Sequence, residues 1–377
     1  MGFVFFREQI YASCVRSPNI LIAKLWGISR YFARIAEQMV GAGNDVGIFS
    51  PLHRNAYLKE LPEGIVRGRW MEKYPPHTAR LILAYNRLKG RSEMSRWQPQ
   101  VVHETYYSRR PSFVSEKCPV VLTVYDMIHE LYPESFSSQD KTTALKQQAV
   151  ERADHVICIS ESTRQDLMRL FAVPESKLSV VHLGFEQFKK VSDKKYCDLP
   201  RPYLLYVGAR YAYKNFAGLL RAVARSKRLK SDFDIVAFGG GEFSQDEQAL
   251  MQSLGFSAGQ VRQIGGDDAL LGQLYEGAKA FVYPSVYEGF GLPPLEAMAH
   301  SCPVVSSSTS SMPEIIGNAG AFFDPGNDDE MAVAIERVVY SDSEVARLVG
   351  LGLERLNHFS WQRCGQETLS IYNSLQR

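Results

Sequence analysis

The chain has 377 residues, which is long for one domain and sufficient for two. With 45% hydrophobic and 22% charged residues, it has the composition of an ordinary soluble protein that can fill two cores. A net charge of +2 gives no overall attraction to nucleic acid, so we expect no nucleic-acid partner. The six cysteines are scattered without a CxxC pair, which indicates neither a zinc site nor a disulfide framework and fits a reducing, cytoplasmic compartment.

Contact with a membrane is expected only at its surface. The N-terminal MGFVFFREQ has a short apolar run before Arg7 and Glu8, unlike a signal peptide, and no run approaches the roughly 18 apolar residues of a membrane span. Residues 53–97, however, hold ten Lys or Arg against four Asp or Glu, mixed with Trp and Tyr. This segment suits peripheral contact with an anionic membrane, on the inner face of the cell membrane, or with an acidic acceptor. A solvated basic face is the alternative that the sequence leaves open.

The first half alternates short apolar runs with helical patterns. Residues 29–43 predict an amphipathic helix capped by Ser29, and residues 161–171 predict one capped by Ser160. The predicted strands are residues 3–6, 45–50, 119–126, 154–160 and 178–184.

The pattern restarts after a polar linker at residues 186–200. Strands are predicted at residues 203–209, 233–241, 261–266, 280–284 and 302–307, and helices at residues 216–226, 268–278 and from 293 onward. Alternating strands and helices on both sides of a linker predict an α/β protein with two doubly wound parallel sheets facing each other.

The stretch SVYEGFGLPPLEAM, residues 285–298, holds two glutamates around a loop with few side chains. A strand ends before it, and Pro293 suits the first turn of the helix that follows. The glycines let the backbone approach a ligand, and a helix N-terminus favours an anion. Glu288 and Glu296 would instead accept hydrogen bonds from sugar hydroxyls. A nucleotide sugar, with a sugar at each end of a diphosphate, meets these demands. For either glutamate alone, a helix cap or a solvated loop residue stays open.

A second candidate binding motif follows the strand YLLYVG, which ends in Gly208. Arg210 and Lys214 come directly after it, and Asn215 is expected to cap the next helix. Two cations beside a helix N-terminus, at the same edge of the sheet as the glycine loop, would neutralise a diphosphate.

These motifs resemble those of retaining GT-B glycosyltransferases of family 4 (glycosyltransferase group 1), and within that family the O-antigen mannosyltransferase B-like subgroup. The motifs that carry the resemblance are the Glu-x7-Glu stretch from Glu288 to Glu296, YVGARYAYKNF, GISRYF, VVHETYYS, TVYDMIHELYPE and FSWQRCGQETLSIYNSL. They extend over nearly the whole chain. The resemblance implies an acceptor-binding Rossmann-like domain at residues 1–185, a nucleotide-sugar-binding one at 201–357, and a last helix at 358–377 that crosses back onto the first domain.

The resemblance also implies residue roles. Glu296 would bind the ribose, and Glu288 would contact the donor hexose as a catalytic residue. Lys214 with Arg210 would hold the diphosphate. The remaining donor contacts implied are Gly27 from the N-terminal side, Gly208, and the backbone amides of Gly289, Phe290, Gly291 and Leu292.

Two departures concern the first domain. Trp26 stands where the family carries the first of two glycines, and Tyr125 stands where the family carries a histidine before Asp126. We expect Asp126 to act at the catalytic site, and His103, Tyr125 and His129 to be candidate acceptor contacts. A structural role is the alternative for each.

The implied function is transfer of a hexose, mannose from GDP-mannose, to a lipid-linked or polysaccharide acceptor in O-antigen-like glycan synthesis. The leaving diphosphate would take the acceptor proton, and neither a metal nor a cofactor would be required. The DFD sequence at Asp232–Asp234 imitates a metal-binding Asp-x-Asp but runs directly into a strand, so we expect no cation there. The alternatives are a nucleotide-sugar epimerase of the same architecture, a transferase using a UDP-sugar, and a non-catalytic sugar-binding protein. A nicotinamide oxidoreductase is disfavoured, because no glycine fingerprint follows the first strand.

Overall fold

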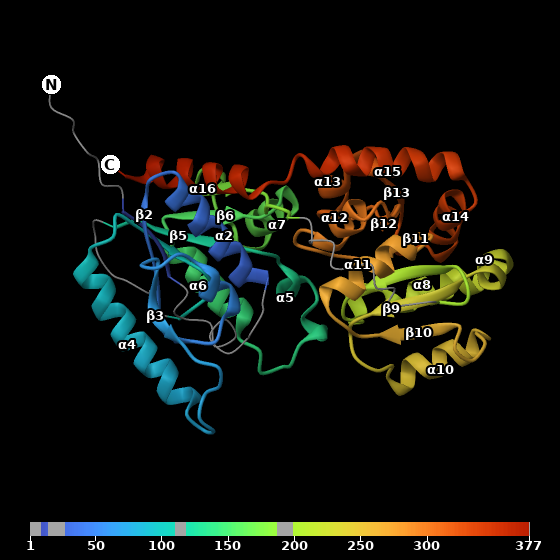
Figure 1. The fold of residues 1–377 in the computed structure, drawn as a ribbon, viewed down its shortest axis with the longest axis horizontal. Helices are drawn as coiled ribbons and strands as arrows, with labels where there is room; N and C mark the ends of the chain where they lie inside the picture. Colours follow the sequence, from blue (N-terminus) through green and yellow to red (C-terminus); the bar gives the residue numbers. More distant parts are fainter. Residues whose placement is uncertain (1–8, 14–26, 110–117, 187–198, 377) are drawn as a thin grey trace. The chain divides into compact units, whose positions relative to one another are not determined.

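The computed structural model describes residues 9–13, 27–109, 118–186 and 199–376. The chain divides into two compact units (Figure 1). The first unit comprises Met1–Glu130, Ser137–Gly184 and Ser360–Arg377, and the second comprises Leu131–Phe136 and Phe185–Phe359. The last stretch of the chain therefore returns to the first unit.

The first unit is built on a seven-stranded sheet with the order β3-β2-β1-β4-β5-β6-β7, paired in parallel throughout. Its strands are β1 (Gln9–Ser13), β2 (Asp45–His53), β3 (Val66–Trp70), β4 (Val101–Glu104), β5 (Val120–Val124), β6 (His155–Cys158) and β7 (Leu178–Val180). The central strands β4, β5 and β6 are almost wholly buried, as a parallel sheet covered by helices on its faces requires. Its helices are α2 (Gly27–Gly41), α3 (Ala56–Glu60), α4 (Ala79–Trp97), α5 (Ile128–Leu131), α6 (Thr142–Arg152), α7 (Glu161–Phe171) and α16 (Trp361–Leu375).

The local predictions for this unit succeed where a helix has a polar cap. Helix α7 has the predicted bounds, and the Ser160 side chain accepts a hydrogen bond from the backbone N–H of Thr163. The prediction for Ser29 is wrong, because α2 begins two residues earlier and Ser29 is fully buried inside it. The predicted strand at residues 3–6 lies outside the described residues. Strand β1 occupies Gln9–Ser13, where a loop was expected.

The second unit has a six-stranded parallel sheet with the order β10-β9-β8-β11-β12-β13. Its strands are β8 (Tyr203–Val207), β9 (Asp234–Phe238), β10 (Val261–Ile264), β11 (Ala280–Tyr283), β12 (Val304–Ser307) and β13 (Gly320–Phe323). Its helices are α8 (Phe216–Arg225), α9 (Lys227–Asp232), α10 (Gln245–Ser253), α11 (Asp268–Gly277), α12 (Leu292–Ala299), α13 (Met312–Ile316), α14 (Asp328–Val339) and α15 (Asp342–Leu356). The prediction of two doubly wound parallel sheets is confirmed.

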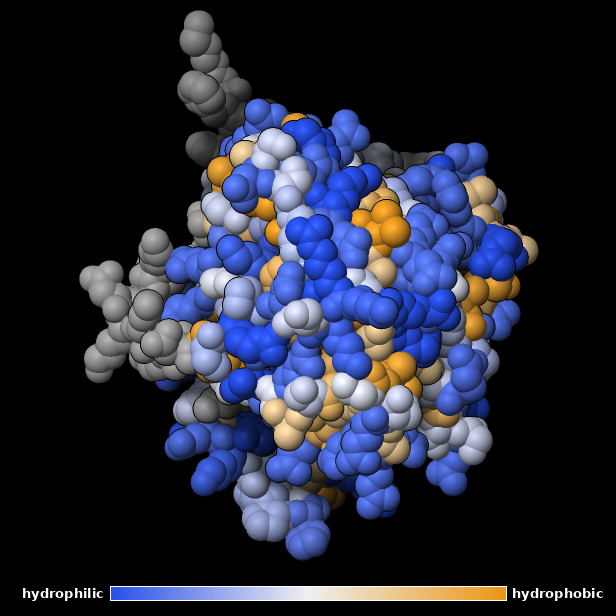
Figure 2. All heavy atoms as spheres, turned by 90° about the vertical axis from the view of Figure 1, so that its right-hand side faces the viewer, coloured by the Kyte–Doolittle hydropathy of each residue, from blue (hydrophilic) through white to orange (hydrophobic). Residues whose placement is uncertain are grey.

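The core of the second unit joins its sheet to α8 and α14, which contribute Leu219, Leu220, Ile335 and Val338, all without solvent exposure. The face drawn in Figure 2 is mostly hydrophilic, with small, separate hydrophobic patches. Scattered patches of this size are normal on a water-exposed surface.

The C-terminal helix α16 packs along α2 of the first unit. Gly365 makes this packing close, since a Cβ there would lie 2.5 Å from Cβ of Gln38. Tyr372 reaches from α16 to His103 on β4, with its hydroxyl 2.5 Å from the ring Nδ1. A buried polar network therefore ties α16 to the sheet.

Candidate functional site

The strand order of the second unit reverses between β8 and β11, which are neighbours in the sheet. Strands from β8 run outward to β9 and β10 on one side, and from β11 to β12 and β13 on the other. In open α/β sheets, ligands bind outside the carboxyl ends of the strands at such a switch point. The loops that leave β8 and β11 contain the two motifs singled out in the sequence, one with Arg210 and Lys214 and the other with Glu288.

An ion pair joins these two loops. Nζ of Lys214 lies 2.7 Å from Oε1 and 2.8 Å from Oε2 of Glu288, across 74 residues of sequence. Their side chains are 19% and 9% exposed, so little water screens the pair. Burial, and next the Glu288 carboxylate, raise the pKa of Tyr283 well above its usual value, so this phenol stays protonated. The sequence assigned the two residues to different parts of a ligand; the structure brings them into direct contact.

Two serines shape the loop that carries Glu288. The Ser310 hydroxyl donates to the Glu288 carbonyl at 2.6 Å, and the Ser311 hydroxyl lies 2.9 Å from the same carbonyl and 2.8 Å from that of Phe290. The Phe290 ring packs edge-on against Phe359, so its side chain belongs to the core. The sequence analysis missed these serines. Their signal is a serine-rich run directly after β12, the strand next to β11.

Helix α12 begins directly after this loop. Gly291 precedes it with a φ of 105°, a left-handed conformation that favours glycine, and proline occupies its first turn as predicted. Leu292 is its first residue, and among its first four residues only Leu292 and Leu295 have a backbone N–H, because Pro293 and Pro294 lack one. Glu296 is half-buried within α12, where its Oε2 accepts a hydrogen bond from the Tyr275 hydroxyl at 3.2 Å. The two glutamates therefore occupy the loop and the helix of one strand-loop-helix unit.

Arg210 has a different surrounding from the one predicted. Its guanidinium donates to Glu247 Oε1 at 2.6 Å and to the carbonyls of Gly239, Gly241 and Glu242 at 2.8 to 3.1 Å. Residues 239–241 are three consecutive glycines with positive φ that form the turn after β9, and Arg210 donates to the carbonyls of the first and the third. The side chain is only 4% exposed. The structure thus places Arg210 as a clamp on the turn after β9, and not as an open charge.

The loop after β8 contains two more of the predicted residues. Gly208 has a φ of 129°, which a side chain would strain, although nothing lies within 4 Å of a Cβ there. Asn215 stands before α8 but its side chain does not cap that helix. It donates instead to the Pro325 carbonyl at 2.9 Å, and its backbone is left-handed, with a φ of 54°, where a capping residue is typically extended. The capping prediction for Asn215 is wrong.

In the first unit, Asp126 lies just beyond the carboxyl end of β5. Its Oδ1 accepts from the Ile128 N–H at 3.1 Å, and its carbonyl accepts from Lys146 Nζ at 2.8 Å. The Lys146 side chain has no exposure, and it also donates to Glu130 at 2.6 Å. The sequence analysis missed Lys146 and Glu130; their signal is a lysine on the buried face of α6, beside Ala149 and Val150.

The three candidate acceptor contacts occupy different environments. His103 is fully buried, its Nε2 lies 2.8 Å from Thr123 Oγ1, and burial lowers its pKa to about 3. With both ring nitrogens bonded inside the unit, His103 belongs to the core, as the structural alternative holds. Tyr125 is partly exposed and donates to the Thr105 carbonyl at 3.1 Å. His129 lies near Asp140, and burial lowers its pKa.

Two other predicted positions lie at the edge of what is described. Gly27 is the first residue of α2. Trp26 lies outside the described residues.

The residues of the DFD sequence have separate protein partners. Asp232 accepts from the Tyr340 hydroxyl at 2.9 Å, whereas Asp234 is buried near Arg201 and Arg262. In the described part of the chain, no three His, Cys, Asp or Glu side chains gather as metal ligands would. None of the described helices is both long and apolar enough to span a bilayer.

Residues 26–186 match the family Glycosyltransferase Family 4, and residues 185–349 match Glycosyl transferases group 1. The chain belongs to the family 4, group 1 glycosyltransferases. This glycosyltransferase is 26% identical to the O-antigen chain mannosyltransferase B of Escherichia coli, over 93% of its own length and 97% of the relative's. It is also 26% identical to the O-antigen chain mannosyltransferase RfbU of Salmonella typhimurium, over 60% of its own length and 62% of the relative's.

Among solved structures, sucrose-phosphate synthase from Thermosynechococcus elongatus superposes on the glycosyltransferase with a TM-score of 0.72. That alignment covers 98% of this chain and 99% of the other at 20% identity. The fold of the glycosyltransferase is GT-B. The predictions of family, fold and enzyme class are confirmed.

Proposed function

We propose that this glycosyltransferase is a retaining mannosyltransferase that uses GDP-mannose and extends a lipid-linked or polysaccharide acceptor of a cell-surface glycan. The observation that carries the proposal is the Lys214–Glu288 pair at the switch point, next to the N-terminus of α12. The choice of mannose is supported by the names of the two O-antigen mannosyltransferases to which the chain is similar.

Lys214 supplies charge to the donor diphosphate. Its ammonium has three N–H donors, and two of them meet the Glu288 carboxylate. The third can donate to a phosphate oxygen, together with the backbone N–H of Leu292 at the start of α12. Arg210 contributes by holding the neighbouring turn in place. With this charge supplied by the protein, no metal or cofactor is required.

The two glutamates would bind the two sugars of the donor. Glu288 accepts from hexose hydroxyls, and Glu296 accepts from the ribose diol, with Gly208, Gly289 and the following loop backbone close to the phosphates. In the transfer step, the bond between the anomeric carbon and the diphosphate oxygen breaks. The acceptor oxygen bonds to the same face of that carbon, and its proton passes to the departing diphosphate. Lys214 stabilises the negative charge that grows on this leaving group.

The acceptor would bind the first unit. Asp126 stands just beyond the end of β5 with Tyr125 and His129 nearby in sequence. Gly27, which opens α2 in the same unit, is assigned to the donor. The Lys146 ammonium donates a hydrogen bond to the Asp126 backbone carbonyl and so holds this segment in place. We therefore assign Asp126 to the acceptor hydroxyl and its neighbours to acceptor contacts.

The enzyme would work at the cytoplasmic face of a membrane, docked through α4. Leu81, Tyr85 and Leu88 recur at helical spacing on this helix and are 71%, 44% and 68% exposed. An exposed apolar stripe on a helix rich in Arg and Lys is typical of helices that lie in a lipid interface. Replacing Leu81 and Leu88 by serine should lower co-sedimentation with vesicles, whereas unchanged sedimentation would contradict docking through this stripe.

The test of the proposed function is transfer itself. Purified enzyme with radiolabelled GDP-mannose and a membrane fraction as acceptor should label lipid-linked glycan, with or without EDTA. UDP-glucose and UDP-galactose are the matched donors. Label transferred only from a UDP-sugar would overturn GDP-mannose as donor, and label lost in EDTA would overturn metal independence.

A further inference from the structure

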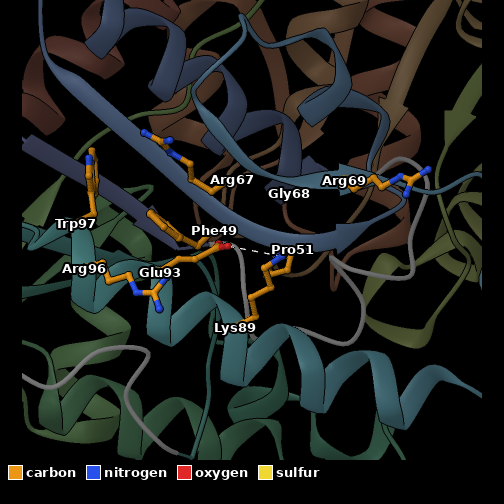
Figure 3. A pocket seen from close by; sticks show the side chains of 9 residues that line it. All are labelled: Phe49, Pro51, Arg67, Gly68, Arg69, Lys89, Glu93, Arg96 and Trp97. Atoms are coloured by element: carbon orange, nitrogen blue, oxygen red, sulfur yellow. Dashed lines mark ion pairs between the residues drawn. The ribbon is translucent and has the colours of Figure 1, made fainter.

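The pocket of about 550 Å³ between β3 and α4 lies in the first unit, whereas the β8 and β11 loops belong to the second. Arg67, Gly68 and Arg69 line it from β3, and Lys89, Glu93, Arg96 and Trp97 line it from α4. In Figure 3 the Arg69 side chain extends away from the other lining side chains. Phe49 and Pro51 of β2 complete the lining. Its volume is in the range of small-molecule sites.

Arg67 and Arg69 flank a point where the backbone of β3 comes unusually close to the backbone of β2. Phe49 pairs with Arg67 and Leu52 with Arg69, so β2 has one extra residue at this point, a bulge that includes Pro51. A Cβ on Gly68 would lie 1.8 Å from the Ser50 carbonyl oxygen. Only glycine at position 68 lets β3 pass so close to the bulge. Arg67 and Arg69, on either side of this glycine, are thereby presented at the outer edge of the sheet.

The pocket carries an excess of positive charge. Four cationic side chains line it against one carboxylate, that of Glu93, which lies 3.8 Å from Lys89 Nζ. Among the described residues, no hydrogen bond or ion pair engages the side chains of Arg67, Arg69 or Arg96. Elsewhere in the same unit arginines such as Arg152 are paired with carboxylates. The guanidinium groups of Arg67 and Arg96, which have no partner among the described residues, are complementary to an anion with several acceptor oxygens.

The Trp97 ring adds an aromatic surface to the lining. Trp97 packs against Phe49 with ring centroids 5.8 Å apart, and a Cβ on Gly47 would lie 3.1 Å from the Trp97 ring. Such a surface suits the apolar or sugar portion attached to the anion.

We propose that this pocket is a second binding site, which takes the phosphate group of a phosphate ester, with Arg67 and Arg96 as its ligands. The site goes beyond the proposed transfer reaction, because it includes no residue assigned to donor or acceptor. None of the three apolar stripe residues of α4 lines the pocket. The phosphate group can belong to a soluble ester or to a membrane lipid headgroup.

The decisive comparison is between two double variants with the same change in charge. Arg67→Ala/Arg96→Ala removes two pocket ligands, and Lys141→Ala/Lys227→Ala removes two exposed lysines that neither line the pocket nor belong to α4. Both variants should keep the thermal unfolding midpoint and donor transfer of the wild type. The soluble probe is glycerol 1-phosphate, titrated by calorimetry, and the lipid probe is vesicles of phosphatidylglycerol in phosphatidylcholine, measured by co-sedimentation.

We expect the pocket variant to bind at least one probe roughly tenfold more weakly or worse, as the loss of charged hydrogen bonds implies, and the control variant to bind it normally. Weakened glycerol 1-phosphate binding identifies a soluble ester as the source, and weakened vesicle binding alone identifies a headgroup. Equal losses in the two variants would mean general surface charge and would overturn the proposal. Absence of binding of both probes to the wild type would overturn it as well.

Discussion

At the scale of single residues, the Lys214–Glu288 pair decides how the donor site works. Both side chains are largely buried at the carboxyl ends of adjacent strands, so the ammonium is positioned before any ligand arrives. Preorganised charge of this kind stabilises a transition state without a reorganisation cost at the moment of reaction. This arrangement leads to separate predictions for the cation and the two carboxylates.

Replacing Lys214 by alanine should lower turnover more than donor affinity, because charge on the departing diphosphate grows toward the transition state. Loss of such a contact lowers the rate by about 10²–10³. Steady-state kinetics, with donor binding measured by calorimetry, would separate the two effects. Lys227→Ala, an exposed lysine of α9, is the control. Full turnover in Lys214→Ala would place the diphosphate elsewhere.

The two glutamates should respond differently to a bare nucleotide and to the whole donor. Glu296→Gln should weaken GDP and GDP-mannose alike, by roughly 1.5–3 kcal/mol, the worth of a charged hydrogen bond. Glu288→Gln should leave GDP binding undiminished, since it removes a competitor for the Lys214 ammonium, and should impair transfer. Calorimetric titration of both variants with both ligands tests this. Equal losses of GDP affinity would contradict the assignment of one glutamate to each sugar.

At the scale of elements, buried polar groups join helices to the first unit's sheet. His103 on β4 bonds to Tyr372 of α16 and to Thr123 of β5, and Lys146 of α6 bonds to the backbone after β5. Each group is stable in the interior only because its partners are in place. The free energy of unfolding should therefore fall when His103 is protonated or when Lys146 is removed.

The unit should lose stability in mild acid through His103. Burial holds its folded pKa at about 3, below the ordinary value of about 6.5. Between these two pH values the histidine binds a proton in the unfolded chain but stays neutral in the folded protein. Its contribution is complete above the unfolded pKa and falls as the pH drops from 6.5 toward 3, by about 2 kcal/mol at pH 5. Urea unfolding at pH 7 and pH 5 should show a smaller acid loss for His103→Gln than for the wild type. An equal acid loss in both proteins would mean that His103 does not titrate this way.

Replacing Lys146 by methionine should destabilise the enzyme by about 3–5 kcal/mol, because it leaves the Glu130 carboxylate without its buried partner. Lys141→Met, on an exposed residue just before the same helix, should change the free energy of unfolding by less than about 0.5 kcal/mol. Urea unfolding measures both. A Lys146→Met enzyme as stable as the control would show that Glu130 loses its charge or reaches water without difficulty.

At the scale of the whole molecule, donor binding should stabilise the native state by mass action. GDP at a hundredfold excess over its dissociation constant should add about 2.7 kcal/mol to the free energy of unfolding. The melting temperature should rise equally in EDTA, because Lys214 and the α12 N-terminus provide the positive charge. UDP and ADP are the matched ligands. A rise that disappears in EDTA would contradict this prediction, and a larger rise with UDP would change the assigned base.

Much of the protein followed from local patterns in its sequence. Apolar runs predicted most strands, because side chains of a buried parallel strand must be apolar on both faces. Ser160 predicted the start of α7, because a cap acts on residues three positions away. The strand, Gly-Phe-Gly loop and helix around Glu288 were predicted for the same reason, and the family motifs extended the interpretation to enzyme class and fold.

The tertiary structure decided which of the marked residues meet. Lys214 and Glu288 pair because β8 and β11 are neighbours in the sheet, although 74 residues separate them. The Arg210 guanidinium donates to carbonyls of the glycine-rich turn after β9, and His103 becomes buried when α16 packs on the first unit. A residue type and its spacing determine the local backbone, but the partner of a charged side chain depends on strand order and on what covers it. These facts arise only when distant segments pack together.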